Sequence, residues 1–275
     1  MSAADLDRFL DAHPASILID LEETRGSTPR AAGTFMLAAA DAIWGTIGGG
    51  QFEYIAIDHA RAMLTGRETR DRLDIPLGPD IGQCCGGRTL LRFGRIDAAL
   101  RHALQGRLQA MQRQRPHVAI FGGGHVGKAL AQALSLLPLA VSVIETRAAE
   151  LTGLPDGVEA RLLAMPEAAI AGLPTGSAVI IVTHDHALDF LIAREALSRP
   201  DLAYTGMIGS ATKRATFSHW LAREGGRPGW LERLTLPIGG GMVKDKRPEV
   251  IAAMTVAEVL TALARCETTI EASRA

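Results

Sequence analysis

The sequence predicts an α/β protein, in which an N-terminal α+β domain precedes a Rossmann-like domain with a doubly wound parallel sheet. After residue 116, apolar segments of strand length alternate with segments of helical periodicity, which is typical of a parallel sheet. A glycine-rich turn joins the first of these strands to a helix, as in dinucleotide-binding folds. Before residue 105, glycine clusters punctuate short strands and helices, which favours an α+β domain.

The N-terminal domain is predicted to contain helices over 6–10 and 52–64 and strands over 15–22, 33–40 and 90–93. A further helix is predicted over 96–114, because Ile96, Leu100 and Leu104 begin an apolar series at helical spacing. The run at 105–116 is polar and rich in Arg and Gln, so this helix leads into a linker, and Pro116 ends the helix. We therefore assign residues 1–112 to the N-terminal domain and residues 113–275 to the Rossmann-like domain.

The second domain is predicted to begin with a buried strand, a glycine turn and a helix. These lie at 117–121, 122–127 and 126–136. Further strands are expected at 139–144, 158–162, 178–182 and 203–208, and helices at 166–171, 187–197 and 211–224. A last helix is expected over 248–265, since Pro248 and Glu249 suit a first helical turn.

Composition excludes several classes of protein. The 275 residues carry 29 Lys and Arg against 30 Asp and Glu, so no basic excess indicates a nucleic-acid or membrane-surface partner. The longest uncharged stretches, 129–144 and 168–184, are too short and too polar to span a membrane. The N-terminus lacks the apolar core of a secretion signal. Three cysteines, two of them adjacent, cannot form a disulfide framework, so we expect a cytoplasmic protein.

The turn at 122–127 matches the dinucleotide fingerprint, with Gly122, Gly124 and Gly127 placed between a strand and a helix. These glycines permit a tight turn, close approach of a diphosphate, and close packing of helix and strand, respectively. The following helix supplies partial positive charge. The alternative is that the glycines serve packing alone.

Three side chains near this turn are candidates for ligand contacts. His125 lies inside the turn and can donate a hydrogen bond to an anion, or is an exposed loop residue. Glu145 closes the second strand, where a carboxylate can accept hydrogen bonds from a ribose. Arg147 can instead meet a phosphate.

Two turns of the N-terminal domain are candidates for binding an anion or a polar ring edge. The segments 26–30 and 45–50 are rich in backbone N–H donors and hydroxyls, and the second contains Gly48, Gly49 and Gly50. Arg30 is the best cation for a phosphate there, because its planar guanidinium is bidentate. The alternatives are ordinary hairpin turns and, for Glu53, an acidic residue in a first helical turn.

Cys84 and Cys85 lie between glycines, which favours an accessible thiol over a buried one. Adjacent side chains diverge, so we expect one of them to face a ligand; the alternative is a small apolar filler. After the strand at 178–182, His184, His186 and Asp189 can ligate a metal or merely cap the next helix. Three cations at 244–247, after a second glycine cluster at 239–241, form a further phosphate candidate or a solvated loop.

Seven segments in this order resemble the XdhC/CoxI family, and the resemblance spans residues 15–262. They are GSTPRAAGTFM (26–36), GTIGGGQFE (45–53), GQCCGG (82–87), FGGGHVGKAL (121–130), VTHDHALD (182–189), YTGMIGSATKRATF (204–217) and KDKRPEVIAA (244–253). Two positions depart from the family pattern: Glu145 stands where Asp is common, and Asp185 where a small polar residue is expected.

The resemblance implies an accessory chaperone rather than an enzyme. Such a protein binds molybdenum cofactor (molybdopterin), supports its sulfuration with sulfur from a cysteine desulfurase, and delivers it to the molybdenum subunit of xanthine dehydrogenase. The residues fit this chemistry: Arg30 and the glycine turns suit the phosphate and pterin, and a thiolate of Cys85 or Cys84 suits the soft molybdenum. Alternatively, that cysteine carries a transient persulfide.

Other functions stay open at this point. The glycine turn with Glu145 also fits an NAD(P)-dependent oxidoreductase, although no Tyr-x-x-x-Lys pair is present. A nucleotide-sensing interaction module is a third interpretation. The Rossmann half can hold part of the pterin cofactor, a separate nucleotide or nothing, and we expect a homodimer.

Overall fold

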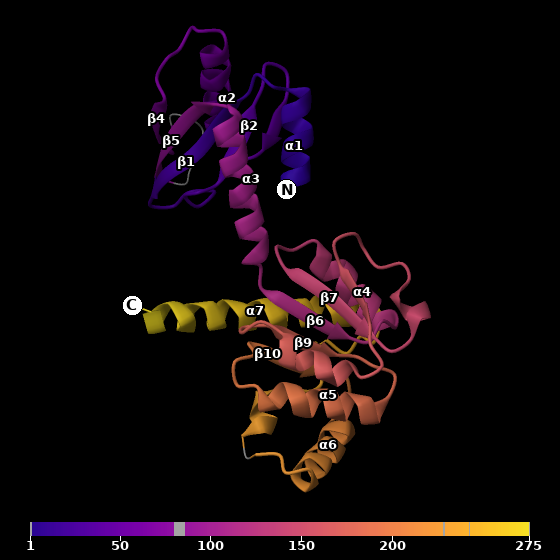
Figure 1. Ribbon diagram of the computed structural model, residues 1–275. Coiled ribbons are helices and arrows are strands. Elements are labelled where there is room, and N and C mark those ends of the chain that lie inside the picture. Colours follow the sequence, from indigo (N-terminus) through magenta and orange to yellow (C-terminus); the bar gives the residue numbers. More distant parts are fainter. Residues whose placement is uncertain (1, 80–85, 228, 242, 275) are drawn as a thin grey trace. The chain divides into compact units, whose positions relative to one another are not determined.

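The computed structural model describes residues 2–79, 86–227, 229–241 and 243–274. It divides the chain into two compact units, the N-terminal unit (residues 1–113) and the Rossmann unit (residues 114–275) (Figure 1). Among the described residues, no helix combines the length and the apolar character needed to cross a membrane. The division into functional domains after residue 112 stays a prediction.

The N-terminal unit is built on a five-stranded antiparallel sheet with the order β3-β2-β1-β5-β4. The strands are β1 (Ile17–Arg25), β2 (Phe35–Ala38), β3 (Ile43–Gly45), β4 (Arg72–Pro76) and β5 (Arg88–Arg95). Three helices accompany it: α1 (Ala3–Ala12), α2 (Gly50–Leu64) and α3 (Ala98–Arg113). Alternate residues of β1 face opposite sides, so Ile17 and Ile19 pack with α2, and Leu18 with α1 and α3.

The Rossmann unit contains a six-stranded parallel sheet with the order β11-β10-β9-β6-β7-β8. The strands are β6 (His117–Phe121), β7 (Ala140–Glu145), β8 (Glu159–Leu162), β9 (Ala178–Ile181), β10 (Tyr204–Met207) and β11 (Leu234–Thr235). This is the doubly wound order, which reverses direction between β6 and β9. The predicted fold class is confirmed.

Helices cover both faces of this sheet, which is why its central strands are continuous apolar runs. The α-helices are α4 (His125–Ser135), α5 (His186–Ser198), α6 (Ala211–Arg223) and α7 (Pro248–Arg274). Three 3₁₀ helices are η2 (Ala148–Leu151), η3 (Pro166–Gly172) and η4 (Trp230–Arg233). The pair α4 and α7 packs on one face, and α5 packs with α6 on the other.

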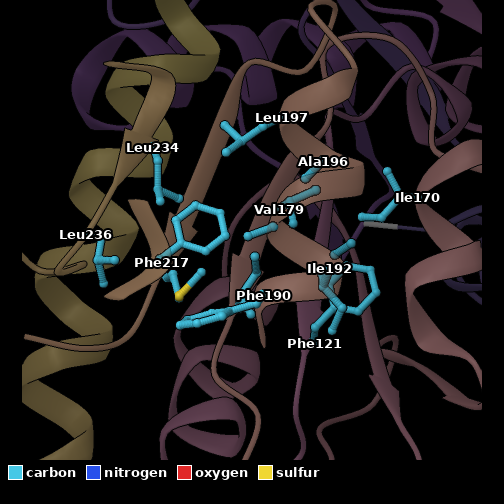
Figure 2. Packing of buried hydrophobic residues seen from close by; sticks show 14 of the residues in the cluster. Phe121, Ile170, Val179, Phe190, Ile192, Ala196, Leu197, Phe217, Leu234 and Leu236 are labelled. Atoms are coloured by element: carbon cyan, nitrogen blue, oxygen red, sulfur yellow. The ribbon is translucent and has the colours of Figure 1, made fainter. Parts of the chain in front are cut away.

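The core on the α5 and α6 face is aromatic at its centre. Figure 2 shows Phe121 and Val179 of the sheet packed among Phe190 of α5, Phe217 of α6 and Leu236. The ring centroids of Phe190 and Phe217 lie 5.1 Å apart and are tilted by 58°, which is a favourable arrangement for two aromatic rings. This core fixes α5 and α6 against the strands whose ends form the site described below.

Three strands lie outside the sequence prediction. In β4, charged residues alternate with apolar ones and Pro76 ends the strand, while β3 has three residues and β11 has two. Strands so short or so exposed carry too weak an apolar pattern to be recognised. The predicted helix at 166–171 is a 3₁₀ helix, η3.

Candidate functional site

The carboxyl ends of β6 and β9 lie side by side where the strand order of the parallel sheet reverses. Ligands bind outside the carboxyl ends of the strands at such a point. The turn after β6 is the glycine turn, residues 122–127, and the turn after β9 begins at Val182. A hydrogen bond from the Val182 N–H to the Phe121 carbonyl, 2.8 Å, holds the two turns together.

The three fingerprint glycines have different neighbours. A Cβ atom added to Gly122, whose φ is +117°, would lie 2.5 Å from the Val182 carbonyl oxygen. One added to Gly127 would lie 1.9 Å from the Gly122 carbonyl oxygen, whereas one added to Gly124 would meet no described atom within 4 Å. The outer two glycines are therefore required for packing, and Gly124 leaves space at the surface for a ligand.

The start of α4 is available to an anion. Gly124 is its N-cap residue, and no side chain caps this end among the described residues. First-turn N–H groups without a capping acceptor, together with the helix dipole, favour a phosphate or carboxylate. His125 is exposed at this position and also lines a groove of about 440 Å³ between α4 and α7.

Glu145, at the end of β7, turns its carboxylate back onto the glycine turn. It accepts a hydrogen bond from the Gly123 N–H at 2.9 Å and is 4% exposed. It also accepts from the Thr146 N–H at 2.8 Å, and the Arg147 Nε lies 3.4 Å away. Burial alone would raise the pKa of Glu145, but these hydrogen bonds lower it to about 2. The predicted ribose acceptor thus braces the turn in this structure.

A buried ion pair lies behind the ends of β9 and β10. Lys213, in the first turn of α6, is 8% exposed and forms a hydrogen-bonded ion pair with Asp189 of α5, which is fully buried. Asp189 also accepts a hydrogen bond from the Thr183 hydroxyl at 2.6 Å. Asp189 is therefore engaged within the protein.

The alternative of a metal site after β9 is not supported. The described residues contain no group of three or more His, Cys, Asp or Glu side chains that can hold a metal ion. His184 and His186 are exposed, and Asp185 caps α5 by accepting from the Ala187 N–H at 2.8 Å. The capping role that the sequence left open is thus filled by Asp185.

In the N-terminal unit, the glycine segments predicted from the sequence meet one another. A Cβ atom added to Gly48 would lie 2.8 Å from the Pro29 ring, so the turns at 26–30 and 45–50 are in contact. Gly87 lies against the first of these turns, because its added Cβ would be 2.2 Å from the Ser27 carbonyl oxygen. Cys84 and Cys85 lie outside the described residues.

Glu53 organises the glycine loop at 45–50. From the first turn of α2, its carboxylate accepts hydrogen bonds from the N–H groups of Ile47, at 2.9 Å, and Gly49, at 3.1 Å. Gly48, Gly49 and Gly50 all have positive φ, a backbone conformation that favours glycine. Donors that the sequence assigned to a ligand are therefore used by an internal carboxylate.

Arg30 is a cation that lies beside this loop. Its side chain is exposed and has no hydrogen bond or ion pair with any residue that the structure describes. Its Cγ atom would lie 3.8 Å from a Cβ atom added to Gly48. At the further phosphate candidate, Lys244 and Lys246 are exposed, but Arg247 is paired with Asp245 at 2.6 Å.

Lys213 and Thr183 were not predicted as site residues. The signals were weak: Lys213 is one of four lysines in the chain, and it lies in the first turn of a helix that follows a strand. Its partner Asp189 is 24 positions away in the sequence. Only the fold brings the two together.

Comparison with known families agrees with this two-unit arrangement. A model described as the XdhC Rossmann domain matches residues 118–259, and one described as the XdhC and CoxI family matches residues 11–75. The chain belongs to the XdhC and CoxI family. This confirms the resemblance that the sequence motifs indicate.

Two proteins are similar to this chain, one in sequence and one in fold. An uncharacterized protein from Escherichia coli K12, YqeB, is 26% identical over 253 residues. The match covers 88% of this chain but 42% of YqeB, so the chain spans about two-fifths of that relative. A crystal structure from Bacillus halodurans, named as a xanthine dehydrogenase, superposes with a TM-score of 0.76 at 19% identity and covers 96% of both chains. That likeness establishes the shared fold.

Proposed function

We propose that this XdhC-family protein is an accessory chaperone that binds molybdenum cofactor, supports its sulfuration and delivers it to xanthine dehydrogenase. The observation that carries the proposal is the meeting of glycine segments in the N-terminal unit beside Arg30, whose side chain pairs with no residue in the described part of the chain. Molybdopterin is the cargo, and it presents a phosphate and a pterin edge to such a surface. Arg30 pairs with the phosphate, because a guanidinium binds phosphate oxygens in bidentate fashion.

The thiol of Cys85 or Cys84 holds the molybdenum end of the cargo in this proposal. In the sequence Cys84 and Cys85 are followed by Gly86 and Gly87, and Gly87 lies against the turn that leads to Arg30. A thiolate is a soft ligand and suits a soft metal centre. Alternatively, the same thiolate carries sulfur from a cysteine desulfurase as a persulfide.

The partners in this proposal are the molybdenum subunit of xanthine dehydrogenase and a cysteine desulfurase. The chaperone acts as a homodimer in the reducing cytoplasm, where its thiols stay available. It does not consume the cofactor, so we propose a maturation factor rather than an enzyme.

The experiment is a transfer assay with the full chain. The protein is purified from cells that make molybdenum cofactor, its molybdenum is quantified, and it is mixed with cofactor-free xanthine dehydrogenase. We expect bound molybdopterin and recovery of dehydrogenase activity. The double variant Cys84→Ala/Cys85→Ala should lose cofactor, while Cys266→Ala, which removes a free thiol of the Rossmann unit, should retain it. Normal retention by the double variant would refute the thiol role.

A second candidate function, an NAD(P)-dependent oxidoreductase, is favoured by the uncapped start of α4 behind the glycine turn. Against it, the Glu145 carboxylate is bound to the turn itself. A fluorescence titration with NADH and NADPH separates the two functions. Tight binding with reduction of a carbonyl substrate would favour the oxidoreductase over the chaperone.

A further inference from the structure

We infer that Lys213 is a positioning residue for the glycine turn, and that it acts through Asp189 and Thr183 to set the affinity of this turn for a diphosphate. The inference rests on the premise of the second candidate function, that the start of α4 behind the glycine turn receives a phosphate, and it does not depend on the cofactor site proposed in the N-terminal unit. It gives a role to a buried ion pair that neither ligand contact nor metal binding explains.

The first link joins Lys213 to two elements at once. Its Nζ donates a hydrogen bond to the Asp189 carboxylate of α5 and another, of 2.9 Å, to the Ile208 carbonyl at the end of β10. At 8% exposure the ammonium group has little access to water, so these acceptors replace its hydration. Lys213 therefore ties α6 to both α5 and the strand end.

The second link runs through the other oxygen of the same carboxylate. Asp189 Oδ1 accepts hydrogen bonds from the Thr183 N–H at 3.2 Å and from the Thr183 hydroxyl at 2.6 Å. Asp189 is fully buried, so its two oxygens are satisfied by Lys213 on one side and Thr183 on the other. Without Lys213 the carboxylate would be a buried, unpaired charge, and it would have to rotate or draw in water.

The third link is a close backbone contact. The space beside Gly122 is filled by Val182 and Thr183, because an added Cβ would lie 2.5 Å from the Val182 oxygen and 2.9 Å from the Thr183 nitrogen. Because these backbone atoms are packed so closely, a displacement of Thr183 also displaces Gly122. A shift of Thr183 therefore moves the glycine turn, which leads into the uncapped start of α4.

A second ion pair lies beside the opposite end of the parallel sheet. Arg199 pairs with Asp201 and donates to the Leu173 carbonyl at 2.7 Å, while the Thr175 hydroxyl donates to Asp201 at 2.9 Å. These residues precede β9 and β10, at the opposite ends of the strands. Breaking this pair perturbs stability without touching the glycine turn, so it provides the control.

The test measures ADP binding by isothermal titration calorimetry on the full chain, with melting temperatures recorded in parallel. Lys213→Met should weaken ADP binding roughly tenfold, since small misplacements of a binding group have effects of this size or larger. Arg199→Met should lower the melting temperature but leave ADP affinity within about twofold of the wild type. Hydrogen exchange at the Gly123 amide, which bonds to Glu145, should quicken in Lys213→Met alone.

Two further variants separate positioning from folding. Asp189→Asn/Lys213→Met removes both charges but leaves an amide oxygen to accept from Thr183, and it should recover most of the ADP affinity. Thr183→Val removes the hydrogen bond from the Thr183 hydroxyl to Asp189, and the side chain that it changes is partly exposed. This variant should weaken ADP binding, and it provides the test even if Lys213→Met does not fold.

The inference is overturned if Lys213→Met and Thr183→Val bind ADP as the wild type does. It is also overturned if the wild-type protein does not bind ADP. That second outcome leaves the chaperone proposal standing, because molybdenum retention and transfer are measured independently of ADP.

Discussion

Two glycine loops, one in each unit, bind an internal glutamate in different ways. In the loop at 45–50, Glu53 comes from the helix that directly follows and accepts from two loop N–H groups, at Ile47 and Gly49. In the turn at 122–127, Glu145 comes from a neighbouring strand and accepts from Gly123, ahead of the uncapped start of α4. A glycine-rich sequence alone therefore does not predict which backbone N–H groups are free to bind a ligand. That depends on where in the fold the neighbouring glutamate lies.

The two units also differ in the source of positive charge that an anionic ligand would meet. Where Glu53 uses the loop donors, an anionic ligand must be met by a side chain. Arg30 is a cation beside Gly48 that has no partner among the residues that the structure describes. At the glycine turn, the helix start itself supplies partial positive charge. The two units thus offer two different means of holding a phosphate.

The largest expected effect comes from comparing two glycines within the Rossmann turn. Gly127→Ala places a methyl group 1.9 Å from a backbone oxygen and should cost more than about 4 kcal/mol of unfolding free energy. Gly124→Ala, at φ −69° and with open space beside it, should cost less than about 1 kcal/mol but reduce ADP binding. Chemical denaturation measures the first effect and calorimetry the second. Equal stability of the two variants would contradict the packing account.

The next effect concerns the buried carboxylate. Glu145→Gln should lower the free energy of unfolding at pH 7 by about 3 kcal/mol, because it removes a charge whose pKa is depressed to about 2. The wild-type advantage should be complete above pH 4.5 and decline as the pH falls towards 2, since a carboxylate with a lowered pKa stabilises only while ionised. Urea denaturation of both proteins from pH 7 to pH 3 measures the gap, and a gap independent of pH would contradict it.

A smaller effect is expected at Gly49, in the N-terminal loop. Its φ of 78° and ψ of −179° are accessible to glycine almost alone, so Gly49→Ala should cost about 1–2 kcal/mol even though an added Cβ meets no described atom. Gly124→Ala is the control, because it adds the same methyl group in equally open space at an ordinary φ. Thermal denaturation should rank the two variants in this order.

The smallest effect is expected from Glu53→Gln, at about 1 kcal/mol. The amide oxygen can still accept from Ile47 or Gly49, and the side chain is only half-buried. Loosening this loop should raise hydrogen exchange at 45–50 while leaving exchange at 122–127 unchanged. Equal changes in both loops would contradict the division of roles between the two glutamates.

The parts of the fold that the sequence predicts are those with a strong local signal. The strand His117–Phe121 is a continuous apolar run ended by glycine, and the structure shows it with the predicted bounds. The strand Arg72–Pro76 escapes prediction, because its alternating Arg and Asp residues face solvent on an outer strand of the sheet. A local sequence pattern therefore identifies a buried strand well and a weakly buried edge strand poorly.

The candidate site likewise contains features that a local motif predicts and features that only the folded structure shows. The glycines at 122, 124 and 127 follow from a motif whose physical requirements are local. The role of Glu145 as a brace does not, because the motif predicts a ribose acceptor and only the folded turn shows the bond to Gly123. The link from Lys213 to Thr183 depends on tertiary contacts between three elements, and no spacing in the sequence encodes it.

The most direct test is hydrogen–deuterium exchange on the purified chain, with and without bound molybdenum cofactor. Our account predicts slower exchange at 26–30 and 45–50 on loading, with loss of that protection in Arg30→Ala. Unchanged exchange in both segments, in a sample whose molybdenum content confirms loading, would contradict the assignment of the cofactor to the N-terminal unit.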